Sequence, residues 1–248
     1  MQYEALAPIY DRLMYHVEYD EWIELIVKVL NRYGDRNDPR ILEIGAGTGV
    51  VGSLLKGMGY RYTASDLSIG MCKEAKRLRN VPVCAADARH LPFRQCFDIA
   101  LFLYDGINYM LTLDEYRKLF ASVSDVILPG GLFLFDITTR ENSMRHFMHY
   151  VDFEDYGDIS YVRNSYYDEA RLIQHNDFTI YRLSDDHRPY YEKFVEKHIQ
   201  KIFFVPEIEK AIPKKRFEVL GIWDGFLFKK YSEKSLRIHF LLRRLDKD

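Results

Sequence analysis

The segment 41–49, with the sequence ILEIGAGTG, strongly constrains the fold of this 248-residue chain. A short apolar run leads directly into a glycine-rich turn, and apolar residues follow at helical spacing from Val50 to Met58. We therefore expect a buried strand, a tight loop and a helix in succession. Glycine permits positive φ and a close approach of the backbone to a ligand, and the free N–H groups at a helix start attract negative groups. The sequence predicts a ligand-binding turn here.

The glycine spacing distinguishes between classes of cofactor. The dinucleotide-binding pattern requires Gly or Ala three positions after Gly47, where this chain has Val50. An acid, Glu43, instead precedes the first glycine, Gly45, by two positions. The turn resembles motif I of the class I S-adenosylmethionine-dependent methyltransferases, E-x-G-x-G-x-G, which Glu43, Gly45, Gly47 and Gly49 match. The resemblance implies S-adenosylmethionine as the cofactor.

Two acids follow the next two predicted strands. Asp66 ends the strand-like run 60–66, at the separation from Gly45 that a ribose-binding carboxylate shows, although it also suits a cap for a helix over 68–79. Asp87 follows the run 82–86 in a segment that resembles the family's adenine-binding segment, and the alternative is a turn acid with a capping role. Because open α/β sheets bind ligands at the carboxyl ends of their strands, both acids are candidate cofactor ligands.

The same resemblance implies further cofactor contacts. The segment 9–15, IYDRLMY, resembles an N-terminal lid of small-molecule methyltransferases, and the alternative is a packing arm. A sulfonium cation is attracted to the face of an aromatic ring, so Tyr10 and Tyr15 are lid candidates. The remaining implied contacts come from small or apolar residues beside the motifs, namely Ala46, Leu67, Ala88 and Leu103.

The apolar run 97–104 is typical of a central parallel strand, and catalytic groups are expected at its end. Leu103 and Tyr104 would flank the methyl donor in the implied site. Asp105 and Asn108 would hydrogen-bond the acceptor, but a turn with an Asx cap before a helix over 113–127 explains them almost as well.

Strand and helix patterns alternate through residue 136, where a Pro-Gly-Gly turn at 129–131 enters a strand over 132–136. We therefore predict an α/β fold with a Rossmann-like seven-stranded methyltransferase sheet, whose last strand, 235–244, is antiparallel. The predicted core comprises residues 1–142 and 205–248. Residues 143–204 form an inserted β-rich subdomain, a cap or a dimerisation surface, with antiparallel strands at 160–166, 174–181 and 193–204.

Methyl transfer depends largely on positioning. Near-attack geometry supplies roughly 7–11 kcal/mol in favourable cases, whereas a general base contributes about 10²–10⁴-fold. The candidates for a base or orienting group are His198, His175 and Tyr104, and the alternative for His198 is a hydrogen-bonded histidine on a sheet face. His146 and His149 would share a helical face, but they lack an adjacent acidic or thiol ligand, so no metal site is expected.

Composition limits the partners. The net charge of −2 gives no basic footprint for nucleic acid, and the run 104–107 lacks the Asn/Asp-Pro-Pro-Tyr/Phe signature of nucleic-acid methyltransferases. The three scattered cysteines suit reduced thiols, and the chain has neither a leader pattern nor a run of about eighteen apolar residues. We therefore expect a cytoplasmic location and no membrane partner.

The predicted function is transfer of a methyl group from S-adenosylmethionine to a nitrogen or oxygen nucleophile of a small molecule, in an enzyme that resembles the sugar N-methyltransferases. Two alternatives stay open: a nicotinamide-dependent oxidoreductase, which Val50 and Asp87 disfavour, and a catalytically silent binding partner or sensor. The acceptor, the choice between N- and O-methylation and a homodimer through the insert are not decided by the sequence.

Overall fold

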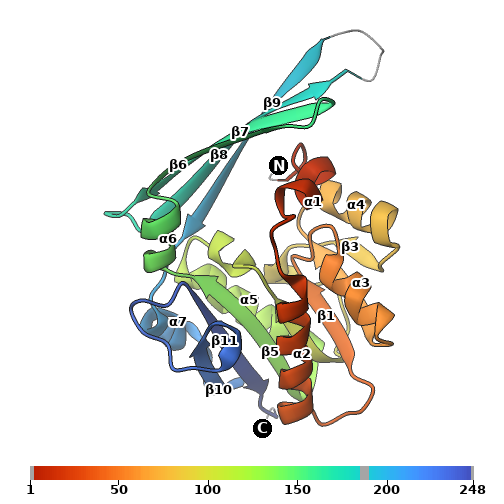
Figure 1. Cartoon of the computed structure of the whole chain (residues 1–248). Coiled ribbons are helices and arrows are strands. Elements are labelled where there is room, and N and C mark those ends of the chain that lie inside the picture. Colours follow the sequence, from red (N-terminus) through yellow and green to blue (C-terminus); the bar gives the residue numbers. More distant parts are fainter. Residues whose placement is uncertain (1–2, 185–189, 247–248) are drawn as a thin grey trace.

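The computed structural model describes residues 3–184 and 190–246, which form two β-sheets (Figure 1). The larger sheet has the strand order β10-β11-β5-β4-β1-β2-β3, and β11 runs antiparallel to both of its neighbours. The predicted seven-stranded methyltransferase sheet with an antiparallel last strand is therefore confirmed. Its strands are β1 (Arg40–Ile44), β2 (Arg61–Asp66), β3 (Val83–Ala85), β4 (Phe97–Phe102), β5 (Ile127–Thr138), β10 (Phe217–Asp224) and β11 (Arg237–Arg244).

Helices cover both faces of this sheet. Successive side chains of a strand point to opposite faces, so Ile41 packs into the layer of α2, α3 and α4, while Leu42 packs into the layer of α5 and α7. These helices are α2 (Tyr19–Tyr33), α3 (Val50–Gly57), α4 (Ile69–Arg79), α5 (Leu113–Val126) and α7 (Val205–Ala211). Both layers are continuous hydrophobic clusters, as a doubly wound sheet requires.

The predicted Pro-Gly-Gly turn before β5 is wrong. Strand β5 begins at Ile127 and runs through these residues, and the β4–β5 register jumps there from Phe97 opposite Ile127 to Ile99 opposite Leu132. Gly130 has a φ of +77°, which a residue without Cβ adopts without strain. The three residues therefore interrupt the pairing within the strand rather than precede it.

The smaller sheet has the order β6-β7-β8-β9 and is antiparallel throughout. Its strands are β6 (His149–Asp155), β7 (Ile159–Asp168), β8 (Ile173–Leu183) and β9 (Tyr191–Lys201), joined to the larger sheet through α6 (Arg140–His146). The sequence predicted β7, β8 and β9 but missed β6. His146 ends α6 and His149 begins β6, so the expectation that these histidines share a helical face is wrong.

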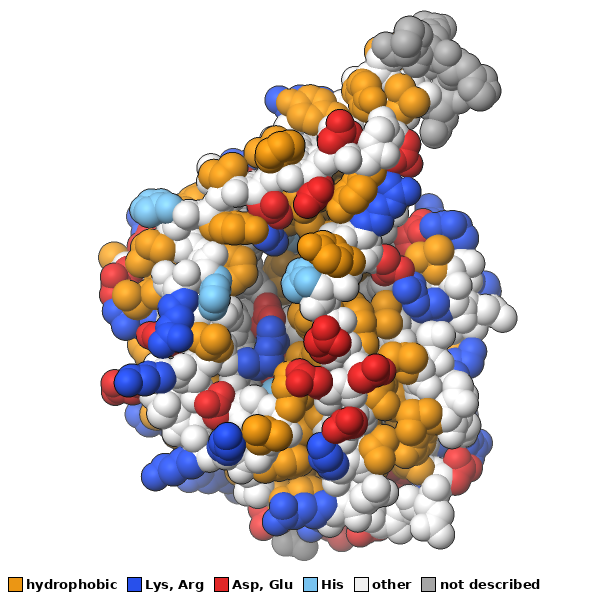
Figure 2. Space-filling view, in the orientation of Figure 1, with side chains coloured by type: hydrophobic (Ala, Val, Ile, Leu, Met, Phe, Trp, Pro, Cys, Tyr) orange, Lys and Arg blue, Asp and Glu red, His pale blue; other side chains and the backbone are white. Residues whose placement is uncertain are grey.

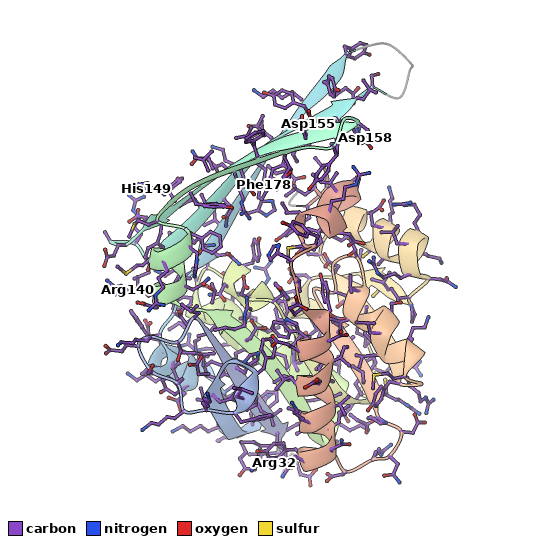
Figure 3. All side chains as sticks on the ribbon, viewed as in Figure 1. Arg32, Arg140, His149, Asp155, Asp158 and Phe178 are labelled. Carbon is purple, nitrogen blue, oxygen red and sulfur yellow. The ribbon has the colours of Figure 1, made fainter. Side chains whose placement is uncertain are left out.

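The N-terminal segment lies beneath part of the smaller sheet and packs against it (Figure 1). This segment contains η1 (Ala7–Ile9) and α1 (Tyr10–Leu13). Leu6 and Ile9 pack against side chains of β7 and β8, among them Phe178, which is labelled on the smaller sheet in Figure 3. Arg12 pairs with Asp158 at the β6–β7 turn, with 3.0 Å between Nη1 and Oδ1. The division into a core of residues 1–142 and 205–248 and an inserted subdomain of residues 143–204 remains a prediction. Among the described residues, no helix is long and apolar enough to cross a membrane.

Candidate active site

The glycine turn joins β1 to α3 in the backbone geometry that its sequence predicts. Gly45, Gly47 and Gly49 have φ angles of +65°, +56° and +79°. A Cβ at Gly45 would lie 2.9 Å from the ring of Phe102, so a larger residue would displace that ring. The turn therefore requires glycine for its conformation and, at Gly45, for space as well.

Asp66 lies at the carboxyl end of β2 beside this turn. Its Oδ2 accepts the backbone N–H of Gly47 at 2.8 Å, and its Oδ1 accepts that of Ser68 at 2.8 Å. Burial raises the pKa of Asp66 above its ordinary value although these bonds lower it. The Ser68 hydroxyl, which accepts from the N–H of Met71, caps α4. The alternative role of Asp66 as the side-chain cap of that helix is therefore not the one observed.

Asp87 follows β3 and lies on the same cavity, but its carboxylate already has a partner. The Arg89 guanidinium binds it through Nε and Nη2, and Nη1 of that arginine contacts Glu115 at 2.5 Å. The hydrogen bonds from Arg89 lower the pKa of Asp87, so this carboxylate is ionised at neutral pH. Its oxygens also accept the Arg89 N–H, as the capping alternative expects.

A first cavity of about 230 Å³ brings together most of the predicted cofactor residues. It is lined by Gly45, Gly47, Asp66, Leu67, Asp87, Ala88 and Leu103. Glu43 and Ala46 line a smaller adjoining pocket instead, together with Tyr10. Burial raises the pKa of Glu43 to about 8, although the Tyr62 hydroxyl hydrogen-bonds its carboxylate and lowers it. Most of the predicted residues therefore line the first cavity, and Glu43 and Ala46 line the pocket beside it.

A second cavity of about 650 Å³ lies between the N-terminal segment, the larger sheet and the smaller sheet. The space-filling view shows the surface hollowed between the smaller sheet and the core (Figure 2). Among the predicted substrate and catalytic residues, Tyr104, Asp105 and His198 line it. Tyr15 also lines this cavity and not the first, and its side chain is 82% exposed. The structure thus places Tyr15 away from the predicted cofactor position.

Asn108 does not line either of these two cavities. Its side-chain N–H donates to the carbonyl of Lys201 at 2.9 Å, and its side-chain oxygen accepts from the N–H of Thr138 at 3.1 Å. The fully buried amide therefore links β5 to the end of β9. The predicted acceptor contact of Asn108 is not observed, because the fold uses the side chain for this link.

Four tyrosines line both cavities: Tyr3, Tyr10, Tyr104 and Tyr109. Tyr10 approaches the glycine turn, since a Cβ at Gly47 would lie 3.7 Å from its ring. Tyr104 has a φ of +62°, a strained conformation for a residue with a side chain, and functional sites concentrate such strain. These four rings therefore lie at the boundary between the two cavities.

A charged cluster at the end of β4 escaped the sequence analysis. Arg237 of β11 pairs with Asp105, at 2.9 Å, and with the buried Asp136 of β5. Its guanidinium also lies over the rings of Trp22 and Tyr104, at 5.3 and 5.0 Å from their centroids. Burial raises the pKa of Asp136 to about 6, although Arg237 lowers it. The antiparallel pairing of β5 with β11 brings these residues together, and no local sequence pattern predicts this cluster.

His198 of β9 is only 1% exposed and is bonded on both ring nitrogens. Its Nδ1 lies 3.2 Å from the Tyr109 hydroxyl, and its Nε2 lies 3.2 Å from Oε2 of Glu196.

His175 pairs with Ile199 in the register of β8 and β9, one position away from the pairing of Asn176 with His198. Side chains alternate along a strand, so His175 points to the opposite face and is excluded as a catalytic candidate. The described residues contain no cluster of three or more His, Cys, Asp or Glu able to hold a metal.

Comparisons with known proteins agree on one family. A model described as a methyltransferase domain matches residues 41–131. A putative methyltransferase of Geobacillus sp. (strain WCH70) is 27% identical over 98% of this chain and 100% of its own length. The putative methyltransferase YqeM of Bacillus subtilis (strain 168) is 29% identical over 97% of this chain and 96% of its own length.

Solved structures share the fold. An S-adenosylmethionine-dependent methyltransferase from Clostridium acetobutylicum ATCC 824 superposes with a TM-score of 0.80, at 23% identity, over 98% of this chain and 99% of its own. The sugar N-methyltransferase KedS8 from Streptoalloteichus sp ATCC 53650 has a TM-score of 0.70 at 18% identity, over 91% and 86% of the two chains. The similarity therefore extends over the smaller sheet as well as the larger one.

Proposed function

Because residues 41–131 match a methyltransferase domain and the fold is that of S-adenosylmethionine-dependent methyltransferases, we propose that this chain transfers a methyl group from S-adenosylmethionine to a nitrogen or oxygen nucleophile of a small molecule. The observation that carries this proposal is the pair of cavities that share four tyrosines. The first cavity is lined by the glycine turn, Asp66 and Asp87, and the second is lined by polar groups from both sheets.

The residues of the first cavity fit the cofactor. Asp66 ends β2 beside the glycine turn, where a ribose can hydrogen-bond to its carboxylate. Asp87 is ionised and lies on the same cavity, where it can accept from an adenine amino group. When bound, S-adenosylmethionine supplies an electrophilic methyl group on a positively charged sulfur. Rings such as Tyr10 and Tyr104 stabilise such a charge by cation–π attraction.

The second cavity suits a polar acceptor of modest size. Its wall on the smaller sheet carries the amides of Gln174, Asn176 and Gln200, all nearly buried. Gln200 donates to Asp105 at 2.6 Å, so the wall is tied to the end of β4. Amide and carboxylate groups of this kind recognise hydroxyl and amino groups. Because the fold neighbour KedS8 is a sugar N-methyltransferase, amines on polyhydroxylated molecules are the first acceptors to test.

The chain's own residues contribute positioning and proton handling. Tyr104, just after β4, lines both cavities and forms part of the wall where donor and acceptor would meet, and its neighbour Leu103 lines the first cavity. Arg237 fixes Asp105 on that wall. His198 is the candidate for moving the acceptor's proton, since its ring lines the second cavity. Holding the two reactants in line between these groups reduces the entropy cost of bringing them together.

We include in the proposal a homodimer through the smaller sheet and a cytoplasmic location, where the three free cysteines stay reduced. Strand β6 is at the edge of its sheet among the described residues, and it exposes 69% of Val151 and 72% of Phe153. An exposed apolar edge strand is a surface for pairing with another chain. Light scattering after gel filtration tests this: Phe153→Lys should convert a dimer into a monomer, and a monomeric wild-type protein would contradict it.

A labelled-methyl transfer assay tests the main proposal. The purified protein is incubated with methyl-tritiated S-adenosylmethionine and a panel of amino sugars, simple amines and alcohols. We expect transfer to at least one acceptor by the wild-type protein and by the surface control Asp20→Ala, and loss of transfer in Asp66→Ala. Binding of S-adenosylhomocysteine without any transfer would favour the catalytically silent alternative, and binding of NADH alone would favour the oxidoreductase.

A further inference from the structure

A chain of hydrogen bonds runs from β9 to the boundary between the two cavities. It connects Glu196 to His198, at 3.2 Å between Oε2 and Nε2, and His198 to Tyr109, at 3.2 Å between Nδ1 and the hydroxyl oxygen. The hydroxyl groups of Tyr109 and Tyr3 are 2.5 Å apart. Tyr109 lines both cavities, whereas His198 lines only the second of them.

Glu196 fixes the direction of the hydrogen bonds. Its two oxygens accept backbone N–H groups of the N-terminal segment, from Tyr3 at 2.8 Å, from Leu6 at 3.3 Å and from Ala5. Burial raises the pKa of Glu196, but the hydrogen bonds from His198 and from the N–H groups of Ala5 and Tyr3 together lower it by more, so its pKa lies below the ordinary value. An ionised carboxylate only accepts, so Nε2 of His198 carries the proton.

The tautomer of His198 decides what Tyr109 does. A neutral imidazole with its proton on Nε2 has a lone pair on Nδ1, which accepts a hydrogen bond from the Tyr109 hydroxyl. The Tyr3 hydroxyl then donates to the oxygen of Tyr109. Burial raises the pKa of Tyr109 above its ordinary value, although the bond from Tyr3 lowers it. Tyr109 is therefore protonated at neutral pH, and it can take up a second proton only by giving its own away.

We propose that Tyr109 takes the acceptor's proton during methyl transfer while it passes its own hydroxyl proton to His198, and that Glu196 stabilises the imidazolium that results. This inference rests on the proposed function. The acceptor's lone pair forms the bond to the methyl carbon, and the electron pair of the broken carbon–sulfur bond stays on sulfur. The acceptor's proton ends on the Tyr109 oxygen and the phenolic proton ends on Nδ1, so atoms and charges balance.

In this relay Tyr109 is the catalytic residue, because it reaches the boundary where donor and acceptor meet. Glu196 is a positioning residue that acts through His198. The ring of Phe178 packs edge-on against the His198 ring, with 5.5 Å between the centroids, and the centroid of the Tyr3 ring lies 4.4 Å from that of His198. The imidazole of His198 therefore has little room to turn. The N-terminal segment supplies both Tyr3 and the N–H groups on Glu196, and the relay is complete only when that segment is in place.

The first test needs no acceptor. Nitrogen NMR of histidine-labelled protein at neutral pH reports the tautomer of His198, assigned by comparison with His198→Gln. We expect the proton on Nε2. A proton on Nδ1 overturns the proposal, because that nitrogen would then be unable to accept from Tyr109. In Glu196→Gln the amide N–H₂ must face either His198 or the backbone N–H groups, so we expect the resonance to change, and an unchanged tautomer and ring environment would contradict the assigned role of Glu196.

The second test compares Tyr109→Phe with Tyr116→Phe in the full chain, with the first amine or alcohol that the wild-type protein methylates. Tyr116 is buried in the core and its hydroxyl has no partner among the described residues, so its loss should leave turnover unchanged. We expect Tyr109→Phe to lower kcat by about 10²–10⁴-fold with KM and the Kd for S-adenosylhomocysteine within about twofold of wild type. Unchanged kcat overturns the relay.

These readouts separate the two proposals. If the wild-type protein binds no S-adenosylhomocysteine and methylates nothing, the proposed function fails, while the histidine tautomer still decides whether the hydrogen bonds from Glu196 to Tyr109 run in the direction described. If His198→Gln reproduces the kcat loss of Tyr109→Phe and both variants bind S-adenosylhomocysteine normally, the relay is supported. If only one of these two variants loses kcat, the relay is contradicted, because both must act in the same proton path.

Discussion

The carboxylate of Asp66 accepts the backbone N–H of Gly47 at 2.8 Å, so the end of β2 and the glycine turn of β1 are held together by one side chain. The same carboxylate lines the first cavity. We expect Asp66→Asn to weaken binding of S-adenosylhomocysteine about 10–100-fold, since hydrogen bonds to a charged group are worth roughly 1.5–3 kcal/mol. Calorimetric titration measures this, with thermal unfolding as the check on the fold. Unaltered affinity would show that Asp66 serves the turn alone.

Gly52 in α3 has no room for a side chain. A Cβ there would lie 2.3 Å from the ring of Tyr62, which is buried between α3 and Glu43. Gly57 in the same helix has nothing within 4 Å of its Cβ position. We expect Gly52→Ala to destabilise the protein by about 1–3 kcal/mol through overpacking, and Gly57→Ala to be neutral or to stabilise it by up to about 1 kcal/mol. Urea unfolding of both variants decides this, and equal effects would contradict the packing argument.

The buried Glu43 makes stability depend on pH. Its pKa is raised by burial from the ordinary 4.5 to about 8, so the folded state favours the neutral form. The stability from this shift is complete below pH 4.5 and is lost as the pH rises through 8. Between pH 5 and 8.5, wild-type protein should therefore lose on the order of a few kcal/mol relative to Glu43→Gln. A difference between the two proteins that stays constant across this range would contradict the raised pKa.

Arg237 neutralises two carboxylates at the end of β4. Removing it leaves Asp136 buried, with one oxygen bonded only to the N–H of Asp105. We expect Arg237→Met to destabilise the protein by about 3–5 kcal/mol at neutral pH, because an unpaired buried charge remains. Adding Asp136→Asn to Arg237→Met should recover part of this loss. Chemical denaturation of the single and double variants measures the coupling, and simple additivity would argue against a charge effect.

Asp11 links the N-terminal segment to the glycine turn through hydrogen bonds and an ion pair. It accepts from the Thr48 hydroxyl at 2.5 Å and pairs with Arg79 at 2.5 Å, and Arg79 also donates to the carbonyl of Thr48 at 3.0 Å. We expect Asp11→Ala to speed amide exchange of the segment 3–15 and to weaken binding of S-adenosylhomocysteine several-fold, with the exposed Asp20→Ala as the control. Exchange rates that match the control would show that the segment is held by its apolar contacts alone.

The core of this fold is predictable because its signals are local. The run from Ile41 to Gly49 specifies a strand, a turn and a helix, and the acids at Asp66 and Asp87 follow the next two strands in the order that a parallel sheet requires. Their cavity could be anticipated since the carboxyl ends of parallel strands meet at one edge. The strand β6 escaped prediction because it lies at the edge of its sheet with mostly exposed residues, and its side chains show no clear alternation.

The residues on the acceptor side of the site come from parts of the sequence that are far apart, so local patterns do not predict their contacts. Glu196 reaches the N–H of Tyr3 across 193 positions, and Arg237 reaches Asp136 across 101. Only the pairing of β5 with β11 and the packing of the N-terminal segment under the smaller sheet bring these groups together. His198 was a candidate from its residue type, whereas its partner Tyr109 was given no role. Asn108 was expected to contact the acceptor because a buried structural amide and a ligand-binding amide look alike in sequence.

Calorimetric titration of the wild-type protein with S-adenosylhomocysteine, with NADH in a parallel titration, tests the central claim most directly. The account predicts saturable binding of S-adenosylhomocysteine at one site per chain, weakened in Asp66→Asn, and no binding of NADH. Binding of NADH in place of S-adenosylhomocysteine would contradict it, because the first cavity would then be a dinucleotide site despite Val50 and Asp87.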